Sequence, residues 1–244
     1  MDKETLRLVG VLLPKIPLIF RVSLLHVLRL SAPAKYLDLR TAVIVSVLRS
    51  LIAPSRPLSI SQTQRLTLKD PGIKGRIWVS NYATSQPPET GVRDVLLAAV
   101  NRLNSAADPP LQARTPDLVP VEAEWTGYRA AAQSKSTLPS ISEKEKYVEL
   151  MKECKSPVTV LYFHGGAYYL LDPASHRPTT KRLAKLTGGR CYSVRYRLAP
   201  QNPFPAALLD ALVSYLTLLY PPPDAFHEPV DPKHIVFAGD RYVL

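Results

Sequence analysis

A histidine and two glycines, His164-Gly165-Gly166, come directly after an uncharged run of β-branched and aromatic residues. The run, Val158 to Phe163, is typical of a strand that is covered on both faces of a parallel sheet. Glycines after such a strand let the backbone curl so that successive N–H groups point outward. Amides arranged in this way stabilise negative charge on oxygen, so the segment indicates an oxyanion hole. His-Gly-Gly also occurs in plain strand-to-loop turns, which leaves a purely structural role open.

Two later segments extend the pattern in a fixed order. The first is Tyr196-Arg197-Leu198-Ala199-Pro200, which leads into Pro203-Phe204-Pro205-Ala206-Ala207 and a helix that carries Asp210-Ala211. The second is the apolar run Ile235 to Ala238, which ends in Gly239-Asp240. In order, spacing and residue type, the three motifs resemble the hormone-sensitive-lipase-like branch of the α/β-hydrolases, also called the fold-3 esterases.

The resemblance implies roles for the residues of the loop. The N–H groups of Gly166 and Ala167 are expected to donate to the oxyanion, with Gly165 shaping the turn. Ala167 stands where many relatives have a third glycine, and this change keeps the N–H group. His164 is expected to support the loop and not to act as the base, because the base of this family follows the nucleophile along the chain.

Other residues receive expectations of narrower scope. Tyr168 and Tyr169 are candidates for the lining of an acyl or alcohol pocket, although core packing explains either one equally well. Arg197 and Asp210 are expected to form a structural ion pair. Gly239 and Asp240 form the lead-in to the nucleophile elbow, and Asp240 is expected to bond backbone and not substrate.

The final residues depart from the family pattern. After Gly-Asp the family continues Ser-Ala-Gly-Gly, whereas this sequence reads Arg241-Tyr242-Val243-Leu244. A guanidinium group stays protonated and offers no lone pair for attack. We therefore expect no catalytic triad and no esterase turnover from these 244 residues. Codons for Arg-Tyr-Val can contain a splice-donor sequence, so a retained intron and a genuinely shortened product both stay open.

Composition excludes several classes of protein. Hydrophobic residues make up 46% and charged residues 21% of the chain, which is typical of globular proteins. Only two cysteines, Cys154 and Cys191, are present and neither has Cys or His at ligand spacing, so we expect no disulfide framework, no metal and no cofactor. The net charge of +11 is not gathered in a Lys/Arg run, and no nucleic-acid signature accompanies it. Nucleic acid is therefore not an expected partner.

The first 58 residues are expected to form a helical cap or membrane-proximal segment. Apolar residues at helical spacing predict helices from Leu18 to Leu30 and from Tyr36 to Ile52. Charged and proline residues interrupt the first apolar run before the ~20 residues that a transmembrane helix needs, and no clear signal peptide is present. A lid over the active site and direct contact with an anionic membrane both fit, and so do a cytoplasmic and a peripheral membrane location.

Residues 59–244 are expected to form a partial α/β-hydrolase domain with a doubly wound, mostly parallel sheet that lacks its C-terminal strands. The last strand should then be an exposed apolar edge. The domain is expected to begin with an antiparallel pair of strands, 65–68 and 75–82. Helices and strands then alternate: the helices are expected at 91–104, 142–154, 172–186 and 205–220, and the strands at 121–128, 158–163, 190–196 and 234–238.

Two function classes remain. The leading one is the carboxylic-ester hydrolase lineage, whose full-length members act on a small-molecule ester or lipid. The other is a non-catalytic membrane-surface or ligand-binding protein that has kept the glycine loop with its part of the pocket and the basic helices of the first 58 residues.

Overall fold

The computed structural model describes residues 13–52, 59–85, 91–103 and 115–240, and at residues 51 and 52 it describes the backbone alone. The chain divides into two compact units, Met1–Gln62 and Thr63–Leu244. From sequence, Pro54 to Pro57 are expected to end the first segment and Thr90 is expected to cap the helix after it; these residues lie outside the described ones, as does the segment 241–244. Most of the predicted proline-rich loop at 108–120 lies outside them as well.

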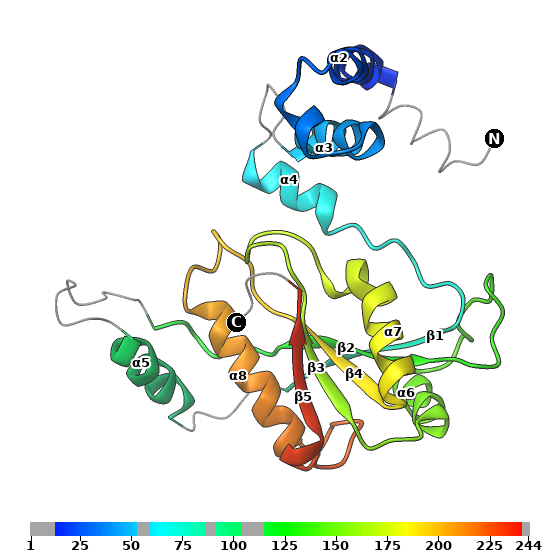
Figure 1. Cartoon of the computed structure of the whole chain (residues 1–244). Helices are drawn as coiled ribbons and strands as arrows, with labels where there is room; N and C mark the ends of the chain where they lie inside the picture. The colour runs from blue at the N-terminus through cyan, green and yellow to red at the C-terminus, as the bar shows by residue number, and fades with distance from the viewer. Residues whose placement is uncertain (1–12, 53–58, 86–90, 104–114, 241–244) are drawn as a thin grey trace. The chain divides into compact units, whose positions relative to one another are not determined.

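A five-stranded mixed sheet forms the centre of the second unit, in the order β1-β2-β4-β3-β5 (Figure 1). Strand β3 is parallel to β4 on one side and to β5 on the other, whereas β2 is antiparallel to both β1 and β4. Four strands therefore run in one direction and β2 alone runs against them. The strands are β1 Ile77–Ala83, β2 Glu122–Tyr128, β3 Thr159–Phe163, β4 Arg190–Arg195 and β5 Ile235–Gly239.

Helices cover both faces of this sheet, as the doubly wound prediction requires. Val160, Tyr162 and Cys191 face Ala184 of α7 (Arg177–Thr187) on one side. On the other side, the larger core includes Trp125 and Leu161 from the strands and residues from three helices. These helices are α5 (Val92–Leu103), α6 (Glu143–Glu153) and α8 (Ala206–Leu219). The parallel strands at the centre are thus buried, which matches their uncharged sequence.

The predicted strand at 65–68 is wrong. These residues belong to α4 (Ile60–Thr67) and the turn after it, and β1 pairs with β2 instead. Ser59 and Gln62 explain the helix: the Ser59 N–H donates to Gln62 Oε1 at 3.1 Å and the Gln62 N–H donates to Ser59 Oγ at 3.3 Å. This reciprocal pair is a capping box, which starts a helix regardless of the short alternation that follows it.

The other helices begin and end where local signals predict. Ser142 and Glu145 form the predicted capping box of α6. The predicted helix from Asp172 starts as the short 3-10 helix η3 (Pro173–His176), capped by Asp172, and α7 ends at Gly188 with φ 66°. The apolar spacing in α5 predicts one buried face made of Val92, Val95, Leu96, Ala99, Val100 and Leu103. This is partly wrong: Val92, Leu96 and Val100 are buried, whereas Val95, Ala99 and Leu103 are exposed.

The first unit contains two longer helices, α2 (Ile16–Val27) and α3 (Leu39–Ile52), close to the predicted ranges. They pack on each other, and the ammonium group of Lys15 donates to the Ser50 carbonyl at 3.4 Å. Asp38 caps α3 by accepting from the Thr41 N–H at 2.6 Å. Among the described residues, no helix combines the length and the apolarity needed to cross a bilayer.

Strand β5 is the last strand on its side of the sheet in the part of the chain that the structure describes. Val236 and Phe237 are each about half exposed. This is the exposed apolar edge that the sequence predicts. Unpaired strand edges of this kind are open to pairing with other chains.

Candidate active site

The candidate site starts at the carboxyl end of β3. His164 follows the strand and is buried, and its ring stacks on Tyr196 with centroids 4.3 Å apart. The His164 Nδ1 lies 2.8 Å from the Gly165 carbonyl, which can only accept, so Nδ1 carries the proton. The Tyr196 hydroxyl donates to the His164 carbonyl at 2.5 Å. Burial lowers the pKa of His164 to about 4, so the ring is neutral near pH 7.

Gly165 lies against Asp240, the residue that follows β5. Its N–H donates to Asp240 Oδ1 at 3.0 Å, and a Cβ at this position would lie 2.4 Å from the Asp240 carbonyl oxygen. Only glycine fits this close approach. The register explains the meeting, because Phe163 pairs with Gly239 and both strands end at the same edge of the sheet.

Asp240 holds several groups together. Its Oδ1 also accepts from the Tyr162 hydroxyl at 2.6 Å, and its Oδ2 lies 3.0 Å from His176 Nε2. Burial raises the pKa of Asp240, but the bonds from Tyr162, His176 and the Gly165 amide outweigh burial and leave the pKa below its usual value. Asp240 therefore bonds backbone as predicted, and it also bonds two side chains that the sequence did not connect to it.

The loop after Gly165 is a tight turn with an unusual backbone. Gly166 has φ 119°, and a Cβ there would lie 2.2 Å from the Leu170 carbonyl oxygen. Ala167, Tyr168 and Leu171 also have positive φ, at 54°, 61° and 71°. Left-handed backbone at residues with side chains is strained, and such strain clusters at functional sites.

The amides of Gly166 and Ala167 differ from that of Gly165. Within the described residues, neither the Gly166 nor the Ala167 N–H makes a hydrogen bond, while the Gly166 carbonyl accepts from Tyr169 and Leu170 at 3.1 and 3.0 Å. Ala167 is exposed. The turn thus uses its carbonyl internally, and no hydrogen bond within the described residues occupies these two neighbouring donors.

Gln64 of α4 is a residue that the sequence analysis missed. It is buried, and its side-chain nitrogen donates to the carbonyls of Tyr169 and Ala199 at 2.9 and 2.7 Å. Thr67, one turn later, accepts from the Leu171 N–H at 3.3 Å. Helix α4 therefore holds the later part of the glycine loop, at Tyr169 and Leu171. The only local signal was the Ser59-Gln62 capping box, which predicts the helix but not its partners.

The two tyrosines after the glycine pair separate in the structure. Tyr168 lines a cavity of about 220 Å³ together with mostly apolar residues of the segment before α8 and of its first turn, among them Phe204, Pro205 and Leu208. Tyr169 is not among the residues that line it, and its carbonyl is bonded to Gln64. The predicted ion pair between Arg197 and Asp210 is confirmed, with Nη2 and Oδ1 at 2.8 Å.

The described residues contain no cluster of three or more His, Cys, Asp or Glu side chains that could hold a metal ion. Both cysteines are free thiols, and Cys191 is buried. Burial raises the pKa of Cys191 to about 12, so its thiol is protonated and unreactive near pH 7.

A buried parallel strand that turns at a glycine pair, beside a strand that ends in Gly-Asp, is consistent with an incomplete α/β-hydrolase fold. Residues 160–241 match the family model described as alpha/beta hydrolase fold. The matched range runs from β3 through the glycine loop to the elbow. Over this range the chain is similar to the hormone-sensitive-lipase-like, fold-3 branch of this family.

Curated relatives agree with this assignment. An acetyl-hydrolase of Streptomyces hygroscopicus is 38% identical over 82 residues, which cover 34% of this chain and 25% of the relative. Hormone-sensitive lipase of Mus musculus is 31% identical over 137 residues, which cover 54% of this chain and 18% of the relative. The chain thus spans a quarter or less of the length of these two relatives.

Solved structures were also found to be similar. An esterase from the bacterial hormone-sensitive lipase family has a TM-score of 0.41 and 20% identity, over 77% of this chain and 42% of that one. A mutant of the esterase E40 has a TM-score of 0.42 and 21% identity, over 78% of this chain and 44% of that one.

Proposed function

We propose that this chain carries the oxyanion-stabilising half of a carboxylic-ester hydrolase that acts on a small-molecule ester. The observation that supports the proposal is the pair of available amides at Gly166 and Ala167. They lie in a strained turn whose first residue, Gly165, is bonded to Asp240. An oxyanion hole and the lead-in to a nucleophile elbow are thereby neighbours.

The chemistry follows from this geometry. When a nucleophile adds to an ester carbonyl, the C=O π electrons move onto oxygen, and the two amides donate to the resulting oxyanion. The donors stand on a turn that Gln64, Thr67 and Asp240 hold in place, so they need no reorganisation when charge develops. Tyr168 and the cavity of about 220 Å³ beside it are our candidate for part of the substrate pocket.

We further propose that a polypeptide of these 244 residues has no esterase turnover. Arg241 occupies the position at which the family pattern has serine, and guanidinium is not a nucleophile. His164 does not supply a base, because its Nδ1–H is bonded to Gly165 and its side chain is buried.

A serine-directed phosphonate probe tests this second point. The folded 244-residue polypeptide is expected to remain unlabelled and to hydrolyse p-nitrophenyl acetate at the background rate. Heat-denatured polypeptide serves as the control for chance reaction with surface serines. Specific labelling of the folded sample would contradict the proposal.

The oxyanion role is tested in a polypeptide in which Ser-Ala-Gly-Gly and the later acid and histidine of a family member follow Asp240. There Gly166→Ala is expected to lower kcat by roughly 10²-fold or more, because the new methyl group collides with the Leu170 carbonyl and moves both amides. Gly188→Ala is the matched control, since Gly188 also has positive φ but lies at the end of α7. Equal effects of the two substitutions would reject the oxyanion role.

A second candidate function, contact with a membrane surface, is supported by α2. Ile16, Phe20, Leu24 and Val27 recur at helical spacing and are all exposed, by 48% to 69%. Arg21 is exposed on the same helix, next to Phe20. An apolar stripe next to cationic side chains is typical of a helix that lies in the interface of an anionic bilayer. Capping of the active site by the same helix is the alternative.

Co-sedimentation of the whole chain with vesicles of phosphatidylcholine and phosphatidylserine distinguishes membrane contact by α2 from capping of the active site. Phe20→Glu is expected to weaken binding markedly if α2 enters the interface. Val95→Glu on α5 is the matched control, because Val95 is also exposed and apolar. Binding that both substitutions weaken equally, or no binding at all, would favour the cap.

A further inference from the structure

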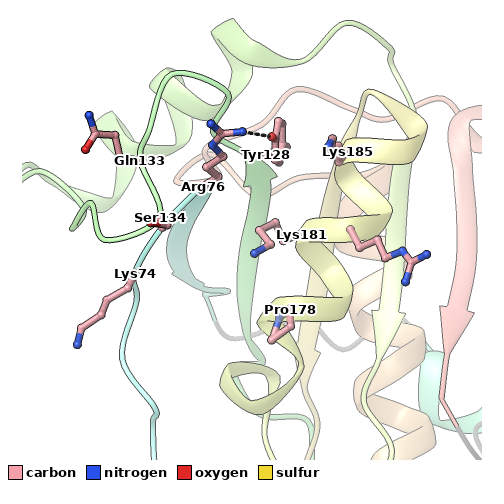
Figure 2. Close-up of a pocket in the computed structure, with 10 residues that line it drawn as sticks. Lys74, Arg76, Tyr128, Gln133, Ser134, Pro178, Lys181 and Lys185 are labelled. Carbon is pink, nitrogen blue, oxygen red and sulfur yellow. Dashed lines mark hydrogen bonds between the residues drawn. The ribbon is translucent and has the colours of Figure 1, made fainter. Parts of the chain in front are cut away.

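A basic pocket lies on α7 and the segment before β1, and shares no residue with the glycine loop. It is an open concavity with a volume of about 790 Å³. Figure 2 shows Lys181 and Lys185 on α7, and Lys74 and Arg76 on the chain that leads into β1, with the Lys74 side chain extending away from Lys181. Its full lining is Lys74, Gly75, Arg76, Tyr128, Gln133, Ser134, Pro178, Lys181, Arg182 and Lys185.

The charge of this pocket is of one sign. Five of the ten lining residues are lysine or arginine, and none is aspartate or glutamate. In the part of the chain that the structure describes, none of these five cations forms an ion pair with a carboxylate. By contrast, Arg177, also on α7, is paired with Asp70 and Glu124. Like charges that line one pocket create a positive potential there, so the arrangement favours a bound anion.

The neutral lining residues add hydrogen-bond donors to the cations. Tyr128 and Ser134 carry hydroxyl groups and Gln133 carries an amide. Arg76 is held in place because its Nε donates to the Ala132 carbonyl at 2.8 Å, and its Nη1 donates to the Tyr128 hydroxyl at 3.4 Å. Lys185 Nζ lies 5.0 Å from the centre of the Tyr128 ring. Lysine and arginine with neutral donors around a concave surface match the acceptor oxygens of phosphate.

The pocket is remote from the candidate active site for a topological reason. Tyr128 ends β2, which is antiparallel to β4, and Tyr128 pairs with Ile77 at the start of β1. Tyr128 therefore lies at the amino ends of the parallel strands, whereas Gly165 and Asp240 follow their carboxyl ends. A ligand held beside Tyr128 would not occupy the ester site.

We propose that this pocket binds a small ligand that carries two or more phosphate groups. The five cations come from two separate segments, and the pocket volume of about 790 Å³ leaves room for more than one phosphate group. The phosphates can belong to a soluble polyphosphorylated molecule or to the headgroup of a polyphosphorylated lipid, since both present the same oxygens.

Binding of inositol hexakisphosphate to the whole chain, measured by titration calorimetry, tests the proposal. Lys181→Ala with Lys185→Ala is expected to weaken binding by about tenfold or more, because two charge-assisted contacts are lost. Lys144→Ala with Lys155→Ala is the matched control: both side chains are exposed, lie outside the pocket and remove the same charge. Circular dichroism checks that each variant is folded. If the double variant Lys181→Ala with Lys185→Ala does not fold, Lys74→Ala, on the segment before β1, is used in its place.

Vesicles distinguish the two sources of phosphate. One set contains phosphatidylinositol bisphosphate and the other contains phosphatidylserine at equal total charge. Preference for the first set that depends on Lys181 and Lys185 supports a lipid headgroup, and binding of the soluble probe alone supports a soluble ligand. No binding of either, or equal weakening by the control pair, overturns the proposal and leaves only nonspecific attraction to a basic surface.

Discussion

Helices α2 and α8 have similar apolar sequences and different surroundings. Helix α8 contributes Leu209, Val213 and Leu218 to the main core, and it packs against α5 and β4. Helix α2 has no buried residue, and among the side chains described in the first unit only Ala42 is buried. An apolar sequence therefore predicts that a helix has a face to cover, but the covering surface must come from elsewhere in the fold.

Truncation of one leucine in each helix gives the largest expected difference. Leu209→Ala is expected to lower the free energy of unfolding by about 2–5 kcal/mol, because it leaves a cavity in a core site with no exposure. Leu24→Ala is expected to change it by less than about 1 kcal/mol, since Leu24 is 48% exposed. Urea denaturation followed by circular dichroism measures both, and equal losses would break the comparison.

The two units also differ in their buried polar side chains. Among the described residues, all of these lie in the second unit. Burial holds the pKa of His164 and of His227 at about 4 in the folded protein. In the unfolded chain the same histidines have a pKa near 6.5, so between pH 6.5 and pH 4 the unfolded state binds more protons than the folded state. The contribution of each histidine to the free energy of unfolding is therefore full above about pH 6.5 and falls as the pH drops toward 4. The loss is on the order of 3 kcal/mol for each fully depressed histidine.

Denaturation midpoints measured from pH 7 to pH 4 test this prediction. His164→Gln is expected to reduce the slope of the free energy of unfolding against pH, because the variant has lost one of the two histidines whose pKa is lowered by burial. An unchanged slope in the variant would show that His164 is accessible to protonation in the folded state.

Helix α4 allows a test within one element. Gln64→Ala removes the donors to the Tyr169 and Ala199 carbonyls and is expected to cost about 1–3 kcal/mol, because those acceptors lose their partner. Arg65→Ala, at the exposed neighbouring position, is the control and is expected to change stability little. Thermal unfolding measures both, and hydrogen exchange of the loop amides after Gly166 would report the loosening directly.

The smallest expected effect concerns backbone strain. Ala167 in the glycine loop and Arg29 after α2 have nearly the same positive φ, 54° and 55°. Glycine at either position relieves the left-handed strain but increases the entropy of the unfolded chain, so a gain of less than about 1 kcal/mol is expected for each. Thermal unfolding checks the sign, and a loss at Ala167 alone would show that its methyl group makes a stabilising contact.

Much of the fold could be predicted because its signals are local. The uncharged run of β3, the capping box of α6 and the glycine after α7 each place an element by short-range physics. The strand predicted at 65–68 failed because four alternating residues are a weak signal and the stronger capping box at Ser59 was overlooked. In α5, Val95 and Leu103 share an apolar character with their neighbours, but the face that meets α8 excludes them.

The sequence by itself determined where chemistry is possible: a buried strand that ends in Gly165-Gly166, and a later one that ends in Gly239-Asp240. Only the tertiary structure decided how these parts meet, because strand pairing brings Asp240 to the amide of Gly165 across 75 residues. It also brought Gln64 to the loop and placed five cations in the lining of one pocket. Hydrogen bonds and charges act over a few ångströms in space, and distance along the chain does not reveal which residues come that close.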